Sequence, residues 1–372
     1  MLKSLVPRQI SIFDCSVKLH RKLCNKTVNC ATNGKLCNKK EVIILFKIEK
    51  SIAEYENWCN ALGVHTTDDL NNSIKNGHIK DIVNLSEIWH SHKISQVADM
   101  IKQNIDTKKL ILISGPSSSG KTTFSKSLKL HLAVLGIKSR ALSLDDYFFD
   151  SSDTPFENLD LTTFDVPEAV DISLLNEHIK LITDGKKVMT PVFDFVTRKR
   201  IENGKEIKLN ENEVIIVEGL HALNEKIASN ISDKQKCKVY CTALTTLKKR
   251  NGNKISSQRT RLIRRLIRDC KFRASSAHLT FKMWQDVEDA AKKYIYPYSD
   301  NADIVFNSSV LYEFGVYKKY VEDIMLSEEI IPEHRIFADK ILSVINNFDY
   351  IDPSVVPPTS IVREFIGGGS LA

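Results

Sequence analysis

The stretch that most restricts the fold is GPSSSGKTT, residues 115–123, which separates the apolar run LILIS from a segment with helical spacing. Two glycines enclose four small or imino residues, and a lysine and a threonine follow the second glycine. A strand, such a loop and a helix, in that order, form a cradle of backbone N–H groups for phosphate. We therefore expect a strand that ends in a phosphate-binding loop and continues into a helix.

The pattern G-x-x-x-x-G-K-T defines a P-loop, and it predicts the cofactors. The loop backbone surrounds the phosphates, Lys121 reaches the outer ones, and Thr122 can ligate Mg²⁺. No N-K-x-D motif for guanine follows, and the H-R-D and D-F-G signatures of protein kinases are absent. The expected cofactors are therefore ATP and Mg²⁺.

From residue 110 onward, short apolar runs alternate with longer amphipathic segments. The runs typical of strands are KLILISG, SRALSLDD, EVIIVEG, KVYCTAL and ADIVFNSS. Strands that alternate with helices predict a mainly parallel sheet covered on both faces. The expected fold class is therefore α/β, a P-loop NTPase fold with a mainly parallel five-stranded sheet, helices on both faces, a lid and a short helical N-terminal preface.

The 372 residues, 42% hydrophobic and 27% charged, suffice for one large domain, or for one large and one small domain. No run of 18 apolar residues occurs, so no membrane span is expected. The tail PPTSIVREFIGGGSLA predicts an extended segment that ends in a flexible glycine run. We expect a basic disordered tail at 1–45, a helical preface at 46–108, the P-loop kinase domain at 109–330, and a C-terminal helix and extended tail at 331–372.

The net charge of +7 is concentrated at the amino end. Residues 1–40 hold nine basic side chains and one acidic one, so the rest of the chain sums to about −1. Two interpretations fit this segment: a disordered tail of a cytoplasmic protein, or an organelle-targeting segment. We favour the first, because the segment has few Ser or Ala and no clean amphipathic period.

The eight cysteines form no CxxC pair and no regular framework. That usage predicts reduced thiols in an intracellular compartment. Four of the cysteines lie within residues 15–37, beside His20, but their irregular gaps argue against a zinc site.

Acidic residues stand at the ends of two of the later predicted strands. LSLDDYF places Asp145 and Asp146 at one strand end, and EVIIVEG places Glu218 at the next. Open α/β sheets bind ligands outside the carboxyl ends of their strands. Asp145 could orient an acceptor hydroxyl and take its proton, and Glu218 lies where P-loop proteins keep a metal-directed acid. Otherwise the aspartates form a solvated turn and Glu218 is a helix N-cap residue.

The stretch SSQRTRLIRRLIRDCKFR, residues 256–273, carries an apolar stripe and an arginine stripe. Alone, it would suit RNA or an anionic membrane surface, and a basic solvated face is a third interpretation. Arginine outnumbers lysine here, which favours a lid over ATP, because arginine binds phosphate bidentately. The arginines of the stripe are Arg261, Arg264, Arg265 and Arg268.

Together these motifs resemble the uridine kinase and phosphoribulokinase family of P-loop kinases, over about residues 110–330. The resemblance is carried by GPSSSGKTTFSK, SLDDYF with FDVPEAVD, TPVFDFVTRKR followed by IIVEGLHAL, and TRLIRRLIRDCKFR. The bacterial-type uridine kinase-like subgroup is similar in SLDDYF, RLIRRLIRD, DIVFNSS and REFIGG, and the likeness reaches back to YENW near residue 55. The resemblance also implies a loss, since we expect these 372 residues to be too few for the ubiquitin-like domain and the second N-terminal domain that the long bacterial members carry.

The resemblance implies a role for each matching residue. Lys121 and Asp145 would be catalytic, with Asp145 as general base, and Thr122, Asp145 and Glu218 would surround Mg²⁺. Asp165 would hold the ribose hydroxyls. The implied nucleotide-binding residues are Gly115, Ser117, Ser118, Ser119, Gly120, Lys121, Thr122, Thr123, Arg268 and Arg273. The implied substrate-binding residues are Asp145, Asp165, Phe193, Phe195, Arg198 and Arg265.

The base-reading positions depart from the family pattern. Phe193 and Arg198 stand where nucleoside kinases typically have Tyr and His, and Ser275 replaces a further arginine of the lid. We expect an ATP-dependent kinase that phosphorylates the primary hydroxyl of a nucleoside, converting uridine to UMP. The alternatives are a kinase of another sugar-containing or anionic acceptor, and an ATP-binding RNA-associated or regulatory protein. The expected partner is a small-molecule acceptor; membrane and nucleic acid are not expected, and a homo-oligomer is left open.

Overall fold

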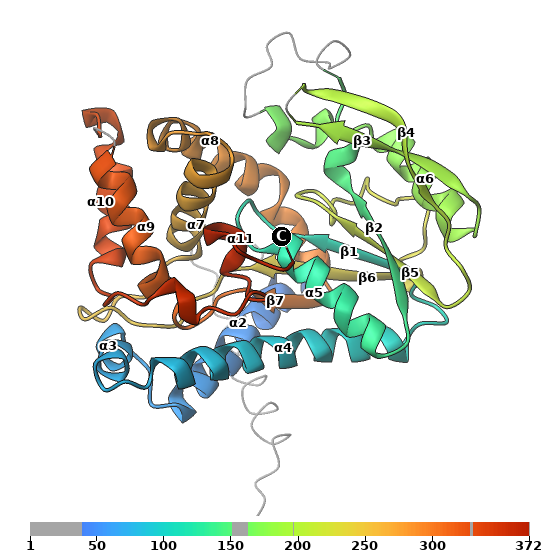
Figure 1. The fold of residues 1–372 in the computed structure, drawn as a ribbon. Coiled ribbons are helices and arrows are strands. Elements are labelled where there is room, and N and C mark those ends of the chain that lie inside the picture. Colours follow the sequence, from blue (N-terminus) through green and yellow to red (C-terminus); the bar gives the residue numbers. More distant parts are fainter. Residues whose placement is uncertain (1–38, 151–162, 196, 328–329, 372) are drawn as a thin grey trace, which may run out of the picture. The chain divides into compact units, whose positions relative to one another are not determined.

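The computed structural model describes residues 39–150, 163–195, 197–327 and 330–371. The chain divides into two compact units, residues 1–46 and 47–372, and side chains are described from residue 47 onward. The predicted basic tail and the four cysteines beside His20 fall almost wholly outside the described residues. The second unit carries the sheet and the site (Figure 1).

Five strands form one parallel sheet in the order β2–β5–β1–β6–β7, which confirms the predicted α/β fold. Every residue of β1 is buried, as expected for a central strand covered on both faces. The strands are β1 (Leu110–Ser114), β2 (Lys138–Ser143), β5 (Glu213–Glu218), β6 (Lys236–Thr242) and β7 (Ile304–Asn307).

The strand register brings three strand ends to one edge of the sheet. Ile113 of β1 and Ser143 of β2 both pair with Glu218, the last residue of β5. On the other side of β1, Ser114 pairs with Tyr240 of β6. Because the strands run in one direction, the loop after β1, the turn after β2 and the end of β5 meet at this edge.

Helices cover the sheet and extend beyond it. The helix α4 packs against α5 and the central strands in one core cluster, with Ile94 and Val97 meeting Phe124 and Leu128. Among the described residues, no helix combines the length and the apolar character that a membrane crossing requires. The helices are α2 (Lys39–Ala61), α3 (Thr67–Lys75), α4 (Ile79–Gln103), α5 (Lys121–Val134), α6 (Ile172–Thr183), α7 (Ser257–Phe272), α8 (Ala277–Tyr294), α9 (Glu313–Ser327), α10 (Arg335–Ile345) and α11 (Arg363–Ile366).

The strands β3 (Val188–Asp194) and β4 (Lys199–Ile207) form an antiparallel hairpin that the sequence analysis did not predict. The β4 sequence KRIENGKEI is mostly charged and mostly exposed, so it lacks the alternation of apolar and polar residues that marks a strand. Pairing with β3 orders it instead, with Phe193 opposite Arg200.

The C-terminal segment is more structured than the predicted extended tail. Residues 363–366 form the helical turn α11, and Phe365 and Ile366 are buried in the same core cluster as residues of α7, α9 and α10. Lys271 of α7 donates a hydrogen bond to the carbonyl oxygen of Ile366 at 2.6 Å. Figure 1 shows α11 beside α7 and close to the start of α5.

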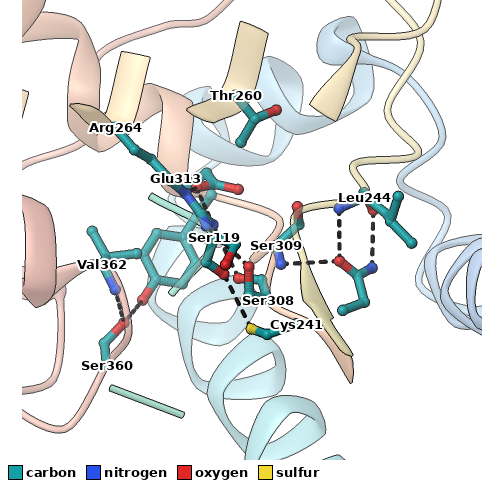
Figure 2. Close-up of polar contacts among 12 residues, drawn as sticks. Ser119, Cys241, Leu244, Thr260, Arg264, Ser308, Ser309, Glu313, Ser360 and Val362 are labelled. Atoms are coloured by element: carbon teal, nitrogen blue, oxygen red, sulfur yellow. Dashed lines mark hydrogen bonds and ion pairs between the residues drawn. The ribbon is translucent and has the colours of Figure 1, made fainter. Parts of the chain in front are cut away.

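A buried ion pair joins α7 to α9 (Figure 2). Arg264 and Glu313 have fully buried side chains, with Nη2 and Oε2 2.7 Å apart. The guanidinium also donates to the hydroxyl and the carbonyl oxygen of Ser308, each at 3.0 Å. Because Ser308 directly follows β7, this network fixes α7 and α9 against the edge of the sheet.

Replacing Glu313 by Gln should lower the free energy of unfolding by about 3 to 5 kcal/mol, because it leaves the buried guanidinium without its counter-charge. Denaturant unfolding followed by circular dichroism measures this. The control is Asp323→Asn on the same helix, which breaks an exposed pair with Lys319 and should cost much less, because exposed ion pairs contribute little to stability. Equal losses in both variants would show that the buried pair does not stabilise the fold.

Candidate active site

The loop between β1 and α5 requires glycine at both ends. A Cβ at Gly115 would lie 2.1 Å from the carbonyl oxygen of Cys241, so the β6 backbone comes too close for a side chain. Gly120 caps α5 with φ at +84°, a left-handed conformation that glycine adopts readily. The turn is closed by the N–H of Ser119, which donates to the carbonyl oxygen of Pro116 at 3.1 Å. Such a loop presents the unpaired N–H groups of the first helical turn to an anion.

Lys121 is the first residue of α5, and its side chain is buried beside this loop. Its Nζ lies 3.4 Å from the carbonyl oxygen of Pro116, which is a long and weak contact. Ser117 is half-buried, and the hydroxyl oxygens of Ser118 and Ser119 are buried without a hydrogen-bond partner. The loop therefore combines a cation that has only one weak hydrogen-bond contact with several polar groups that a phosphate could satisfy.

Asp145 and Glu218 are carboxylates that face this ammonium. Burial raises the pKa of Asp145 to about 6, while Lys121 acts to lower it and Asp146 to raise it. Burial likewise raises the pKa of Glu218 to about 7, opposed by Lys121 and reinforced by Asp145. The structure thus brings both predicted acids and the lysine into one electrostatic group.

The neighbouring Asp146 has a different position. Its Oδ1 accepts a hydrogen bond from the N–H of Phe193 at 3.3 Å, which ties the turn after β2 to the hairpin strand β3. Burial raises the pKa of Asp146, and that hydrogen bond acts to lower it. Asp146 therefore holds the hairpin, whereas Asp145 faces the loop lysine.

The hydroxyl-bearing Thr122 is exposed at the second position of α5. Together with Asp145 and Glu218 it offers oxygen ligands only, which is the donor set that Mg²⁺ prefers. Within the described ranges, no group of three or more His, Cys, Asp or Glu side chains is arranged to hold a metal by itself. These residues therefore fit a magnesium ion that takes further ligands from phosphate and water.

Three arginines at the end of α7 converge on the buried carboxylate of Asp269. The nitrogen–oxygen distances are 3.1 Å from Arg265, 2.8 Å from Arg268 and 3.6 Å from Arg273. Arg265 also donates to the hydroxyl of Ser117 at 3.0 Å, which joins this helix to the loop. The three arginines predicted for phosphate or substrate thus form one cluster next to the loop.

Asp165 belongs to the same cluster. It ends a single 3-10 turn (Thr163–Asp165). Burial raises its pKa, and Arg265 and Lys121 are the foremost of the cations that oppose this shift. The residue predicted to hold the acceptor is therefore brought toward both the arginines and the loop.

The hairpin positions line the other side of the turn after β2. Phe193 is 5% exposed and Phe195 is 58% exposed, with ring centroids 5.2 Å apart. Phe148, which follows the aspartates, lies 5.5 Å from the Phe193 ring. Arg198 is half-buried in the turn between the hairpin strands, with φ at +55°. Aromatic rings thus pack beside the turn that carries the two aspartates, and Arg198 lies in the loop that joins the hairpin strands.

Two arginines of the α7 stripe do not belong to the site. Arg261 pairs with Glu288 of α8 and Arg264 pairs with Glu313 of α9, and both arginine side chains are fully buried. The prediction that four arginines form one face toward phosphate or RNA is therefore wrong for these two. All four arginines lie on one side of α7, since they are spaced three and four residues apart. Arg261 and Arg264 differ from the other two because acids of α8 and α9 pair with them.

Sequence reasoning missed three polar residues of the site. Asp269 had a signal, since it is the one acid within the arginine stretch. His221 is buried beside Tyr294, and burial lowers its pKa to about 4; only its place three residues after Glu218 pointed to it. For Glu364 the signal was its place in the motif REFIGG, but the motif did not indicate its contact to Thr123, which joins residues 241 positions apart.

Three comparisons with known proteins relate the chain to kinases. Residues 110–312 match the sequence model of the Phosphoribulokinase / Uridine kinase family. The uridine kinase of Anoxybacillus flavithermus is 30% identical over 197 residues, which cover 53% of this chain and 84% of that protein. The uridine kinase of Ligilactobacillus salivarius is 30% identical over 206 residues, which cover 54% and 86%. Among solved structures, the D-glycerate 3-kinase of Cryptococcus neoformans is similar with a TM-score of 0.40 and 13% identity, over 58% of this chain and 92% of that one.

The raised pKa of Glu218 predicts a pH-dependent stability. The folded protein binds this proton more tightly than the unfolded chain, so stability falls as the pH rises from about 4.5 through about 7. Glu218→Gln removes this loss and should stabilise the nucleotide-free protein by about 1 to 3 kcal/mol at pH 8, and little at pH 4.5. Thermal unfolding at both pH values measures the difference.

The exposed Glu211 provides the control, because Glu211→Gln removes the same charge away from the site. That variant should behave like the parent protein at both pH values. A Glu218→Gln protein that is no more stable than the parent at pH 8 would contradict the conclusion that the ionised Glu218 carboxylate destabilises the fold.

Proposed function

The chain belongs to the Phosphoribulokinase / Uridine kinase family, and we propose that it transfers the γ-phosphoryl group of ATP to a primary hydroxyl of a nucleoside, with uridine as the first candidate. Family membership makes it an ATP-dependent nucleoside kinase-like phosphotransferase. The observation that carries the proposal is the placement of Asp145 and Glu218 at adjacent strand ends, facing Lys121 of the phosphate-binding loop.

The loop and the arginine cluster would bind the nucleotide. The loop backbone and the first turn of α5 supply N–H donors to the phosphates, and Lys121 supplies a cation for the outer ones. Arg268 and Arg273 would spread the negative charge that develops during transfer. The residues proposed for ATP are Gly115, Ser117, Ser118, Ser119, Gly120, Lys121, Thr122, Thr123, Arg268 and Arg273.

Thr122, Asp145 and Glu218 would hold the magnesium ion, as their oxygen-only donor set supports. When bound, the ion neutralises charge on the phosphate oxygens. The pKa values of both carboxylates lie near neutral pH. A cation in their vicinity would therefore favour their ionised forms.

Asp145 would act as the general base for the acceptor hydroxyl. A pKa near 6 leaves it mostly ionised at pH 7, yet basic enough to take a proton in the transition state. Asp165 would hold neighbouring hydroxyls of the acceptor, and Arg265, which contacts the loop through Ser117, would link acceptor and nucleotide.

The acceptor pocket would be completed by the hairpin. The exposed Phe195 offers aromatic surface for a planar base, and the buried ring of Phe193 packs against it. A second candidate function is phosphorylation of an acceptor that already carries a negative group. The observation that favours it is Arg198, a half-buried arginine in the turn between the two hairpin strands, because guanidinium groups bind anions bidentately.

Asp145→Asn keeps the shape of the side chain and removes its ability to accept a proton. The variant should lose about 10² to 10⁴ in kcat while ATP binding is largely retained. Asp146→Asn is the matched control, since Asp146 bonds to the Phe193 N–H and can do so as an amide. Steady-state kinetics with a coupled assay measures both, and the reverse ranking would place the base at Asp146.

A panel of acceptors with labelled ATP tests the acceptor class. We expect uridine to be phosphorylated by the wild type, and Phe193→Tyr combined with Arg198→His to raise kcat/KM for uridine by about tenfold, the effect of one added hydrogen bond. For a phosphorylated sugar acceptor, Arg198→Ala should lower kcat/KM by about tenfold or more. Indistinguishable values in wild type, Arg198→Ala and the double variant would show that this position does not select the acceptor.

A further inference from the structure

The helical turn α11 places a carboxylate, that of Glu364, next to the phosphate-binding loop. The Oε2 atom of Glu364 accepts hydrogen bonds from the hydroxyl of Thr123 at 2.6 Å and from its N–H at 3.2 Å. Thr123 is the third residue of α5, so its N–H is one of the first-turn donors that has no partner within the helix. In a P-loop, these donors belong to the cradle that receives the phosphates.

The backbone that carries Glu364 is firmly anchored. Arg363 donates to the carbonyl oxygens of Pro353 and Gly367, at 3.0 and 3.3 Å. Phe365 and Ile366 are at most 2% exposed. Ile361 also meets the loop, since a Cβ at Gly120 would lie 2.4 Å from its Cδ1. Only the half-buried side chain of Glu364 is therefore positioned to change its contacts without unfolding the segment.

The charge of this carboxylate has the same sign as that of a nucleotide phosphate. An ionised carboxylate makes strong hydrogen bonds to N–H and O–H donors, as a phosphate oxygen does. One N–H cannot serve both anions well, and two anions at one helix end repel each other. Glu364 and a phosphate bound at Thr123 are therefore competitors.

We propose that Glu364 sets the affinity for the phosphoryl donor, by occupying as an internal anion the Thr123 donors that a phosphate takes on binding. The inference rests on the proposed function, because it requires ATP at this loop. Nucleotide binding must turn the carboxylate away, so the affinity is lower than the loop alone would provide. A carboxylate that merely supports the start of α5 would have the opposite effect, since its loss could only weaken binding.

The test uses Glu364→Gln in the full chain. The amide keeps the shape and can still accept a hydrogen bond from Thr123, but it has no negative charge. We expect the dissociation constants of Mg²⁺-ATP and of inorganic tripolyphosphate to fall about tenfold, measured by isothermal titration calorimetry. The KM for ATP should fall similarly, with kcat changed less than about twofold. Tripolyphosphate shows that the gain arises at the phosphates and not at the base.

Asp352→Asn is the matched control, because it removes one negative charge from the same C-terminal segment while its bond to the Ser354 N–H lies away from the loop. It should leave both dissociation constants unchanged. Glu364→Ala is a second variant that abolishes the contact altogether, and it should also bind both ligands more tightly, even if its thermal stability falls.

Equal or weaker binding by both Glu364 variants, with wild-type protein that binds ATP and transfers phosphate, overturns the inference and leaves the proposed function standing. Absence of Mg²⁺-ATP binding by the wild type and by every variant overturns the proposed function, and the inference with it. Tighter binding of both ligands by the Glu364 variants, with an unchanged control, supports both.

Discussion

The parallel register around β1 is the constraint on which the site depends. Glu218 pairs with Ile113 on one side and with Ser143 on the other, so the ends of three strands are level. The loop after β1 consequently begins beside Glu218, and Asp145 follows only two residues after Ser143. A shift of one residue would turn Glu218 to the opposite face of the sheet, and would separate it from Lys121. The geometry of the candidate site is thus a consequence of strand pairing and not of the loop alone.

The site is further organised by anions that belong to the chain itself. Asp269 pairs with Arg265, Arg268 and Arg273 and offsets part of their positive charge, and Glu364 bonds to Thr123 at the loop. Unpaired arginines so close together would repel each other, because burial weakens solvent screening. Internal carboxylates therefore allow a phosphate-binding surface to be fully assembled before the phosphate arrives. Binding then becomes an exchange of one anion for another.

The sequence predicted the elements and side chains whose structural partners lie nearby in the chain. It failed for those whose partners lie far away in the chain. Five apolar runs with helices between them sufficed for the parallel sheet, and strand ends sufficed to bring Asp145 and Glu218 to one edge. The hairpin strand β4 escaped prediction because its charged residues are ordered by pairing with β3. The burial of Arg261 and Arg264 depends on Glu288 and Glu313, which lie in later helices. Glu364 depends on a contact across most of the kinase domain. The residues next to these positions in sequence do not indicate the contacts, and even the motif REFIGG, which contains Glu364, does not indicate the contact to Thr123.

The arginines of α7 form two groups with different partners, and this limits how the site can change when a nucleotide binds. Arg261 and Arg264 hold the helix in the core through buried ion pairs, and moving it would expose charges whose partners stay behind, at a cost of several kcal/mol. Arg265, Arg268 and Arg273 share one replaceable partner, Asp269. We therefore expect closure over the phosphates to come from these side chains and from the residues after Phe272, with the axis of α7 unchanged. The helix is fixed by Arg261 and Arg264, so that the arginines nearer its C-terminal end can change partners.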